Sequence, residues 1–153
     1  MGRTDTSARV IAAPLAATYS ALVDPEALLE WLPPGGMSAR FEHFDLRPGG
    51  SYRMVLTYAD ASDAPGKYSA DSDVVEARFV EVAPDQRVVQ AIDFVSDDPD
   101  LAGTMTMTWS VAVVDGGTRV EIRADDVPPG ISAADHAQGM GSSLANLAAH
   151  LER

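Results

Sequence analysis

Six segments in which apolar and polar residues alternate follow one another between Met37 and about Asp126. Alternation with a period of two is typical of β-strands that bury one face. The segments are ARFEHFDL, SYRMVLTY, SDVVEARFVEV, RVVQAIDFV, TMTMTWSVAVV and TRVEIRAD, and the stretches between them are rich in Gly, Pro and Asp, as hairpin turns are. The sequence therefore predicts an antiparallel meander, and the rest of the chain must cover one face of that sheet.

Shorter elements precede this series of strands. The stretch SARVIAAP is typical of a strand, and Pro14 stands where a first helix would begin. Asp24 has the properties of an N-cap because Pro25 follows it at the first position of a second helix, which PPGG at residues 33–36 then ends. The predicted order before the meander is one strand and two short helices.

The last segment predicts a helix that begins after Ser132 and continues to the end of the chain. Ser132 and Asp135 form a weak version of the capping box. Residues spaced by three or four positions make one mainly apolar stripe along this helix: His136, Met140, Leu144, Leu147 and Leu151. We expect the helix to cover the concave face of the twisted sheet.

Two glycines stand inside this predicted helix. Gly139 and Gly141 each cost a helix about 1 kcal/mol relative to alanine. The sequence therefore predicts either the close approach of another backbone or a bend that leaves room beneath the helix, although HAQGMG is also compatible with a tight packing site.

The chain is strongly acidic, with 11 basic and 23 acidic residues and a net charge of −12. No cluster of basic residues interrupts this charge, so we expect neither a nucleic acid nor an anionic membrane surface as a partner. The acidic surface is explained either by solubility or by the binding of a basic protein partner.

The length of the chain and its content of Cys and His limit the possible domain organisation and kinds of site. A chain of 153 residues is most simply one domain, here residues 1–153. The N-terminus has no basic and apolar signal pattern, so we expect a cytoplasmic protein with no membrane-spanning segment. With no Cys and three His, we expect no disulfide, no metal site and no cofactor.

The combination of segments resembles the START-like (SRPBCC, helix-grip) superfamily, and within it the proteins similar to the C-terminal domain of the activator of the heat-shock protein 90 ATPase. The stretches that carry the resemblance span nearly the whole chain: IAAPLAATYSALVDPEALLEWLPP, DLRPGGSYRM, FVEVAPDQRVV, GTMTMTWSV, GGTRVEIRADDVPPGI and DHAQGMGSSLANLAAHL. None of these stretches is a catalytic signature.

The resemblance implies an α+β fold in which a seven-stranded curved antiparallel sheet wraps around a long C-terminal helix, with two short helices after the first strand. It also implies a cavity between sheet and helix for a small, mainly apolar ligand. It does not imply one activity, because such proteins include lipid carriers, hormone receptors and cyclases. A chaperone partner and a role in stress response are suggested by the family name alone, which comes from a two-domain cochaperone whose N-terminal domain has no counterpart in these 153 residues.

Methionines and a tryptophan share one face of the segment TMTMTWSVAVV. Alternation groups Met105, Met107 and Trp109 with Val111 and Val113, and we expect this face to point inward. Methionine side chains suit an adaptable cavity wall, but the same residues could simply fill a core. In SYRMVLTY, the same argument groups Tyr52 and Met54 on an inward face, where the Tyr52 hydroxyl would need a partner.

Two further residues are candidates for the ends of the cavity. Trp31 ends the second short helix, where the resemblance often places an aromatic residue. His136 is the polar residue of the helical stripe, so it is either a structural residue or a group that contacts a ligand or acts as a general base. Catalysis would need an orienting partner, and the sheet offers four candidates: His43, Asp45, Asp73 and Asp93.

We therefore predict a domain, monomeric or homodimeric, that binds a small hydrophobic or amphipathic molecule between sheet and helix. The residues predicted to line or guard the space are Trp31, Tyr52, Met54, Met105, Met107, Trp109, His136 and Met140. Two alternatives remain open. One is a cyclase- or hydrolase-like enzyme that uses His136 with an Asp or Tyr, and the other is a stress- or chaperone-related interaction module.

Overall fold

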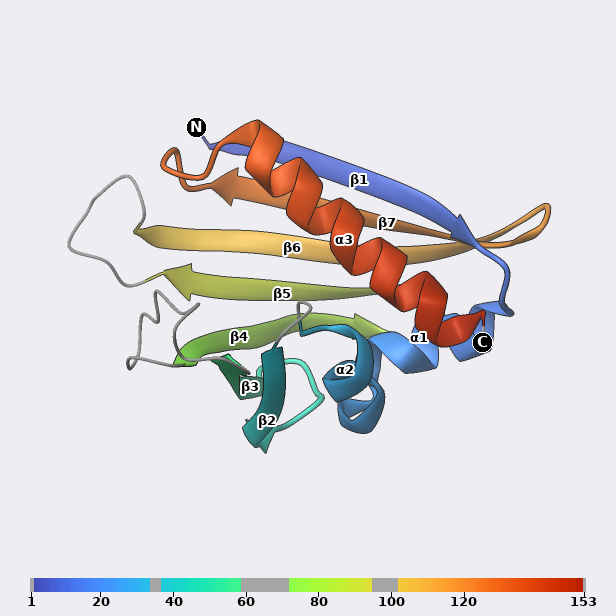
Figure 1. Cartoon of the computed structure of the whole chain (residues 1–153), viewed down its shortest axis with the longest axis horizontal. Coiled ribbons are helices and arrows are strands. Elements are labelled where there is room, and N and C mark those ends of the chain that lie inside the picture. The colour runs from blue at the N-terminus through green and yellow to red at the C-terminus, as the bar shows by residue number, and fades with distance from the viewer. Residues whose placement is uncertain (1, 34–36, 59–71, 95–101, 153) are drawn as a thin grey trace.

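The structure is a computed structural model, and it describes residues 2–33, 37–58, 72–94 and 102–152. These residues form seven strands and three helices (Figure 1). In chain order they are β1 (Arg3–Ile11), α1 (Leu15–Val23), α2 (Pro25–Trp31), β2 (Met37–Phe44), β3 (Ser51–Tyr58), β4 (Ser72–Ala83), β5 (Arg87–Phe94), β6 (Gly103–Val114), β7 (Gly117–Val127) and α3 (Ala133–Leu151).

All seven strands belong to one antiparallel sheet with the order β1-β7-β6-β5-β4-β3-β2. Strands β2 to β7 follow one another as the predicted meander, and β1 closes the sheet beside β7 (Figure 1). The predicted α+β helix-grip fold is confirmed, because a seven-stranded curved antiparallel sheet, a terminal helix and two short helices are all present.

The tight connection between β6 and β7 depends on glycine. Gly116 has a φ of +90° and Gly117 a φ of +145°, a region that L-residues with a side chain rarely adopt. A Cβ atom at Gly117 would also lie 2.0 Å from the carbonyl oxygen of Ile11. Glycine at this position therefore lets β1 approach the hairpin closely.

Two of the three predicted helix starts are confirmed by capping bonds. The Asp24 carboxylate accepts a hydrogen bond of 3.1 Å from the Glu26 backbone N–H, with Pro25 as the first residue of α2. The Ser132 hydroxyl accepts one of 3.0 Å from the Asp135 N–H at the start of α3. The part of the predicted stop signal at residues 34–36 lies outside the described residues.

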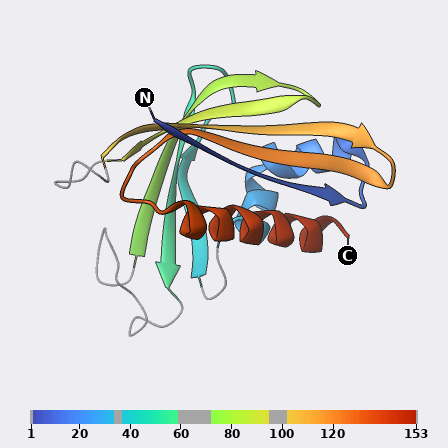
Figure 2. The same cartoon turned by 90° about the horizontal axis from the view of Figure 1, so that it is seen from above.

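Helix α3 lies on the concave side of the sheet, which curls around it (Figure 2). Its stripe enters the main core: Met140, Leu144 and Leu147 are buried, with exposed fractions of 3%, 1% and 0%. Helices α1 and α2 pack at the end of the sheet nearest the C-terminus of α3 (Figure 1). The core is therefore shared by the sheet, α3 and the two short helices.

One expectation about local environment is wrong, and another is narrowed. Val113 shares a face with Trp109 and was expected inward, but its side chain is 74% exposed because the β6–β7 hairpin extends past the helices (Figure 1). Of the explanations offered for Gly139 and Gly141, close approach of another backbone and tight packing do not apply, since a Cβ at either position would meet no described atom within 4 Å outside the backbone of α3. The alternative of a bend with room beneath the helix stays a prediction. In addition, β1 begins at Arg3, four residues before the predicted strand.

Candidate functional site

A cavity of about 250 Å³ lies between the sheet, the two short helices and α3. Strands β3, β4, β5 and β6 form its floor, α1 and α2 form one end, and α3 contributes one residue. The described residues that line it are Leu22, Leu28, Trp31, Leu32, Tyr52, Met54, Leu56, Val75, Val88, Gln90, Ile92, Met107, Trp109 and Ser143. The wall is mainly apolar because the inward faces of four strands meet the apolar side of α2.

Five of the eight residues singled out from the sequence line this cavity: Trp31, Tyr52, Met54, Met107 and Trp109. Trp31 and Trp109 are the only tryptophans of the chain, and their ring centroids lie 5.7 Å apart in an edge-to-face arrangement. The Trp31 indole N–H donates a hydrogen bond of 2.9 Å to the Ala21 carbonyl oxygen. This bond ties α2 to α1 and fixes the Trp31 ring at one end of the cavity.

Tyr52 places a polar group against the apolar wall. Its side chain is 5% exposed and packs among the rings of Phe41, Phe44 and Phe79. Burial raises the pKa of the Tyr52 hydroxyl to about 12, so the group remains protonated at neutral pH. No described residue forms a hydrogen bond with this hydroxyl. Tyr52 is thus a largely buried residue of the cavity lining whose hydroxyl has no hydrogen-bond partner among the residues described.

Sequence reasoning missed two polar lining residues, Gln90 and Ser143. Gln90 alternates with Val88 and Ile92 along β5, so a polar residue on the inward face of a strand was the available signal. Ser143 precedes Leu144 at the edge of the helical stripe, and no periodicity distinguishes it from an exposed serine. Neither side chain has a hydrogen-bond partner within the described part of the chain.

A surface groove adjoins the cavity between α2 and α3. The groove measures about 310 Å³ and shares Leu32 and Ser143 with the cavity. The rest of its lining comes from small or polar residues on α3: Asp135, Gln138, Gly139, Ser142 and Asn146. The groove and the cavity therefore border on each other at Leu32 and Ser143.

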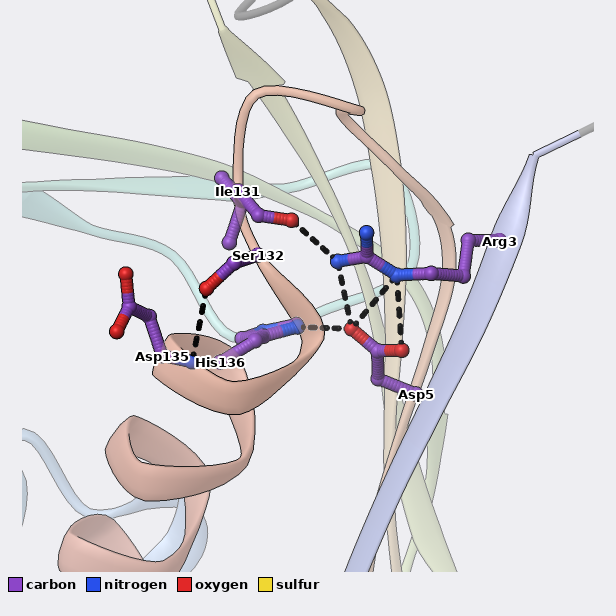
Figure 3. Close-up of polar contacts among 6 residues, drawn as sticks. All are labelled: Arg3, Asp5, Ile131, Ser132, Asp135 and His136. Carbon is purple, nitrogen blue, oxygen red and sulfur yellow. Dashed lines mark hydrogen bonds and ion pairs between the residues drawn. The ribbon is translucent and has the colours of Figure 1, made fainter.

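His136 does not line the cavity; it ties the start of α3 to β1 (Figure 3). Its Nδ1 atom donates to the Asp5 carboxylate at 2.8 Å, and both side chains are largely buried, 14% and 11% exposed. Arg3 Nε donates to the same carboxylate at 3.0 Å, and Arg3 Nη2 also reaches the Ile131 carbonyl oxygen at 2.5 Å. We call Arg3, Asp5 and His136 the β1–α3 clamp.

The clamp also affects the ionisation of its acid. The hydrogen bond from Arg3 lowers the pKa of the Asp5 carboxyl below its usual value, and the hydrogen bond from His136 adds to this effect against the opposing effect of burial. The carboxylate is therefore the stable form of Asp5 in the folded protein. This carboxylate therefore links β1 to the start of α3.

The partners proposed for His136 from the sequence are engaged elsewhere. Asp45 pairs with Arg47 at 2.7 Å, Asp93 accepts a hydrogen bond from Thr104 at 2.6 Å, and His43 Nε2 lies 3.0 Å from the Ser51 hydroxyl. The side chain of Asp73 lies outside the described residues. Asp5 was missed, although Arg3 and Asp5 share one face of β1 by alternation.

The two remaining candidates are buried away from the cavity lining. Met105 packs with Ala124 and Val127 in a small separate cluster under β7. Met140 is 3% exposed and belongs to the main core beneath α3. The inward face of β6 therefore passes from this small cluster at Met105 to the cavity at Met107 and Trp109.

The described residues contain neither a metal-binding cluster nor a membrane-spanning helix. No three His, Cys, Asp or Glu side chains in residues 2–33, 37–58, 72–94 and 102–152 are placed to hold a metal ion together. Of the helices in these same ranges, none combines the length and the apolar character that a bilayer-spanning helix needs.

Comparisons with known proteins agree with the geometry. A family model described as "Activator of Hsp90 ATPase homolog 1-like protein" matches residues 12–152. None of the curated proteins matches the sequence significantly.

Several solved structures are similar over nearly the whole chain. The crystal structure of a Chromobacterium violaceum protein is 31% identical, with a TM-score of 0.82 over 98% of this chain and 97% of the other. An AHSA1-like protein from Aeromonas hydrophila is 18% identical, with a TM-score of 0.78 over 98% of this chain and 92% of the other. A Rhodobacter sphaeroides protein is 21% identical, with a TM-score of 0.78 over 99% and 94%. The last two show likeness of fold alone.

Proposed function

The chain belongs to the family of activator of Hsp90 ATPase homolog 1-like proteins, and we propose that it binds a small, mainly apolar molecule in the cavity between the sheet and α3. One observation carries the proposal: the described lining of a cavity of about 250 Å³ is almost entirely apolar, and it includes Tyr52, a largely buried residue whose hydroxyl forms no hydrogen bond with a described residue. A bound molecule would bury this apolar wall and offer the Tyr52 hydroxyl a hydrogen-bond partner.

The apolar wall supplies the affinity. Burying about 300 Å² of apolar ligand surface is worth roughly 7 kcal/mol before the costs of association are subtracted. The cavity has the volume of about eight liquid water molecules and is slightly smaller than the usual range of ligand pockets. The ligand is therefore a compact molecule, one or two rings in size.

The enzyme alternative gains no support from the geometry. His136 is the only histidine in the predicted site, and it is absent from the described lining of the cavity and bonded to Asp5. A general base must reach the proton that it removes. No particular contact favours the interaction module either. The single domain, the cytoplasmic location and the monomeric or dimeric state remain predictions.

Native mass spectrometry of protein purified from its own cells tests the proposal. We expect an added small-molecule mass that disappears in a denatured control. Replacing Ser143→Phe places a ring at the cavity wall, where there is space for it, and we expect this variant to lose the adduct.

The matched control is Ala145→Phe, because Ala145 is exposed on the same helix and outside the cavity lining. It should keep the adduct. An adduct that survives Ser143→Phe, or the absence of any adduct from the wild type, would count against ligand binding in this cavity.

A further inference from the structure

We propose that the cavity selects uncharged ligands and that the Tyr52 hydroxyl recognises one hydrogen-bonding group on them. This inference rests on the proposed function and adds the chemical class of the ligand. It is carried by two features of the cavity: the chemistry of its described lining and the position of one hydroxyl.

The first feature is the absence of charge. None of the described residues that line the cavity is Asp, Glu, His, Lys or Arg. An ionised ligand group would leave water without gaining a counter-charge, which is strongly unfavourable. An anion would also meet the field of a protein with a net charge of −12. A cation would gain from that field, but within the described lining it finds no carboxylate.

The second feature is the Tyr52 hydroxyl. Tyr52 lies on β3 and is 5% exposed, and the apolar side chains of Met54 and Leu56 follow along the same face of the strand. Because its pKa is about 12, it offers a neutral O–H donor over the whole physiological range. A site with an unpaired donor discriminates against an analogue that lacks the matching acceptor.

A second polar group lies across the floor of the cavity. Gln90 is on β5, separated from β3 by β4, and its amide also has no partner among the described residues. A ligand of one or two rings that pairs with Tyr52 therefore has a further donor and acceptor within the same cavity. Neither group carries a charge, so both favour hydroxyl or carbonyl oxygens over ionised groups.

Four probes of nearly equal shape test the inference: naphthalene, 2-naphthol, 2-naphthoate and 2-naphthylmethylammonium. Their dissociation constants are measured by calorimetry at pH 7. We expect 2-naphthol to bind at least tenfold tighter than either charged probe. Tyr52→Phe should weaken 2-naphthol about tenfold and leave naphthalene unchanged.

Tyr19→Phe is the matched control. The Tyr19 hydroxyl likewise has no partner in the described part of the chain, but it is fully buried and Tyr19 is not a lining residue. This variant should leave the binding of 2-naphthol and naphthalene unchanged. Equal loss in both variants would show that the effect of Tyr52→Phe comes from the core in general, and this would overturn the role of Tyr52.

The outcomes separate this inference from the proposed function. If a Ser143-dependent adduct is present but 2-naphthol shows no advantage over its charged analogues, selection by charge is wrong while ligand binding stands. If that advantage is present but Tyr52→Phe leaves it unchanged, recognition by Tyr52 is wrong. If there is neither an adduct nor binding of any probe, both proposals fail.

Discussion

Replacing Gly139 and Gly141 by alanine should stabilise the protein. Both glycines lie inside α3, and a Cβ atom at either position would meet no described atom within 4 Å outside the helix backbone. Neither has the positive φ that would make alanine strained. The substitution therefore removes the entropic cost of glycine in a helix and adds no clash.

The expected magnitude follows from helix propensity. Alanine is favoured over glycine by about 1 kcal/mol per position, so the double variant should gain about 2 kcal/mol. For a domain of about 150 residues, each kcal/mol raises the melting temperature by about 2 to 4 °C. We therefore expect the double variant to melt about 4 to 8 °C higher.

Thermal melting followed by circular dichroism and urea titration with an unchanged m-value measures this gain. Gly49→Ala is the matched control, because a Cβ there also meets open space but the φ is +86°. That variant should lose stability, by about 1 kcal/mol. If Gly139→Ala and Gly141→Ala give no increase while Gly49→Ala behaves as expected, then α3 does not keep its helical geometry at these positions, and the reasoning is wrong.

Two further predictions concern the clamp and the core. Asp5→Asn should lower stability at pH 7 by about 1 kcal/mol, because the hydrogen bonds to a charged carboxylate are weakened. Since the folded pKa of Asp5 lies below its unfolded value, this contribution is present above about pH 4 and is lost as the pH falls through the folded pKa. Urea titrations at several pH values should therefore show the unfolding free energies of wild type and variant converging in acid. A difference in unfolding free energy that is independent of pH would contradict the role given to Asp5. Leu147→Ala removes a side chain that is 0% exposed and should cost about 3 to 5 kcal/mol, whereas Val113→Ala, at 74% exposure, should change stability by less than about 0.5 kcal/mol. Equal losses of unfolding free energy in these two variants would show that the core is not where the structure places it.

Much of the fold could be predicted because its signals are local. Alternation over eight to twelve residues is enough to predict a strand with one buried face, and a Ser or Asp before a helical segment predicts where the helix begins. The caps at Asp24 and Ser132 are confirmed for this reason. The order of the strands followed from short connections, since consecutive strands joined by tight turns pair with each other.

The cavity lining could be predicted only in part. Alternation in the sequence predicts that Met105, Met107, Trp109 and Val113 share one face of β6, and in the structure they do. Their surroundings differ, however: one packs in a small cluster, two line the cavity and one is 74% exposed. The environment of each side chain depends on where α1, α2 and α3 cover the strand. A local sequence pattern holds no information on how far along the strand these helices extend.

The sequence alone determined the strands, the helices, their caps and the inward faces, because each depends on neighbours a few residues away. The tertiary structure decided which side chains meet. Asp5 and His136 are 131 positions apart in the chain, and their bond exists because β1 and α3 pack side by side. The cavity beside Tyr52 exists for the same reason: the sheet and the three helices pack around it and leave the Tyr52 hydroxyl without a hydrogen-bond partner among the described residues.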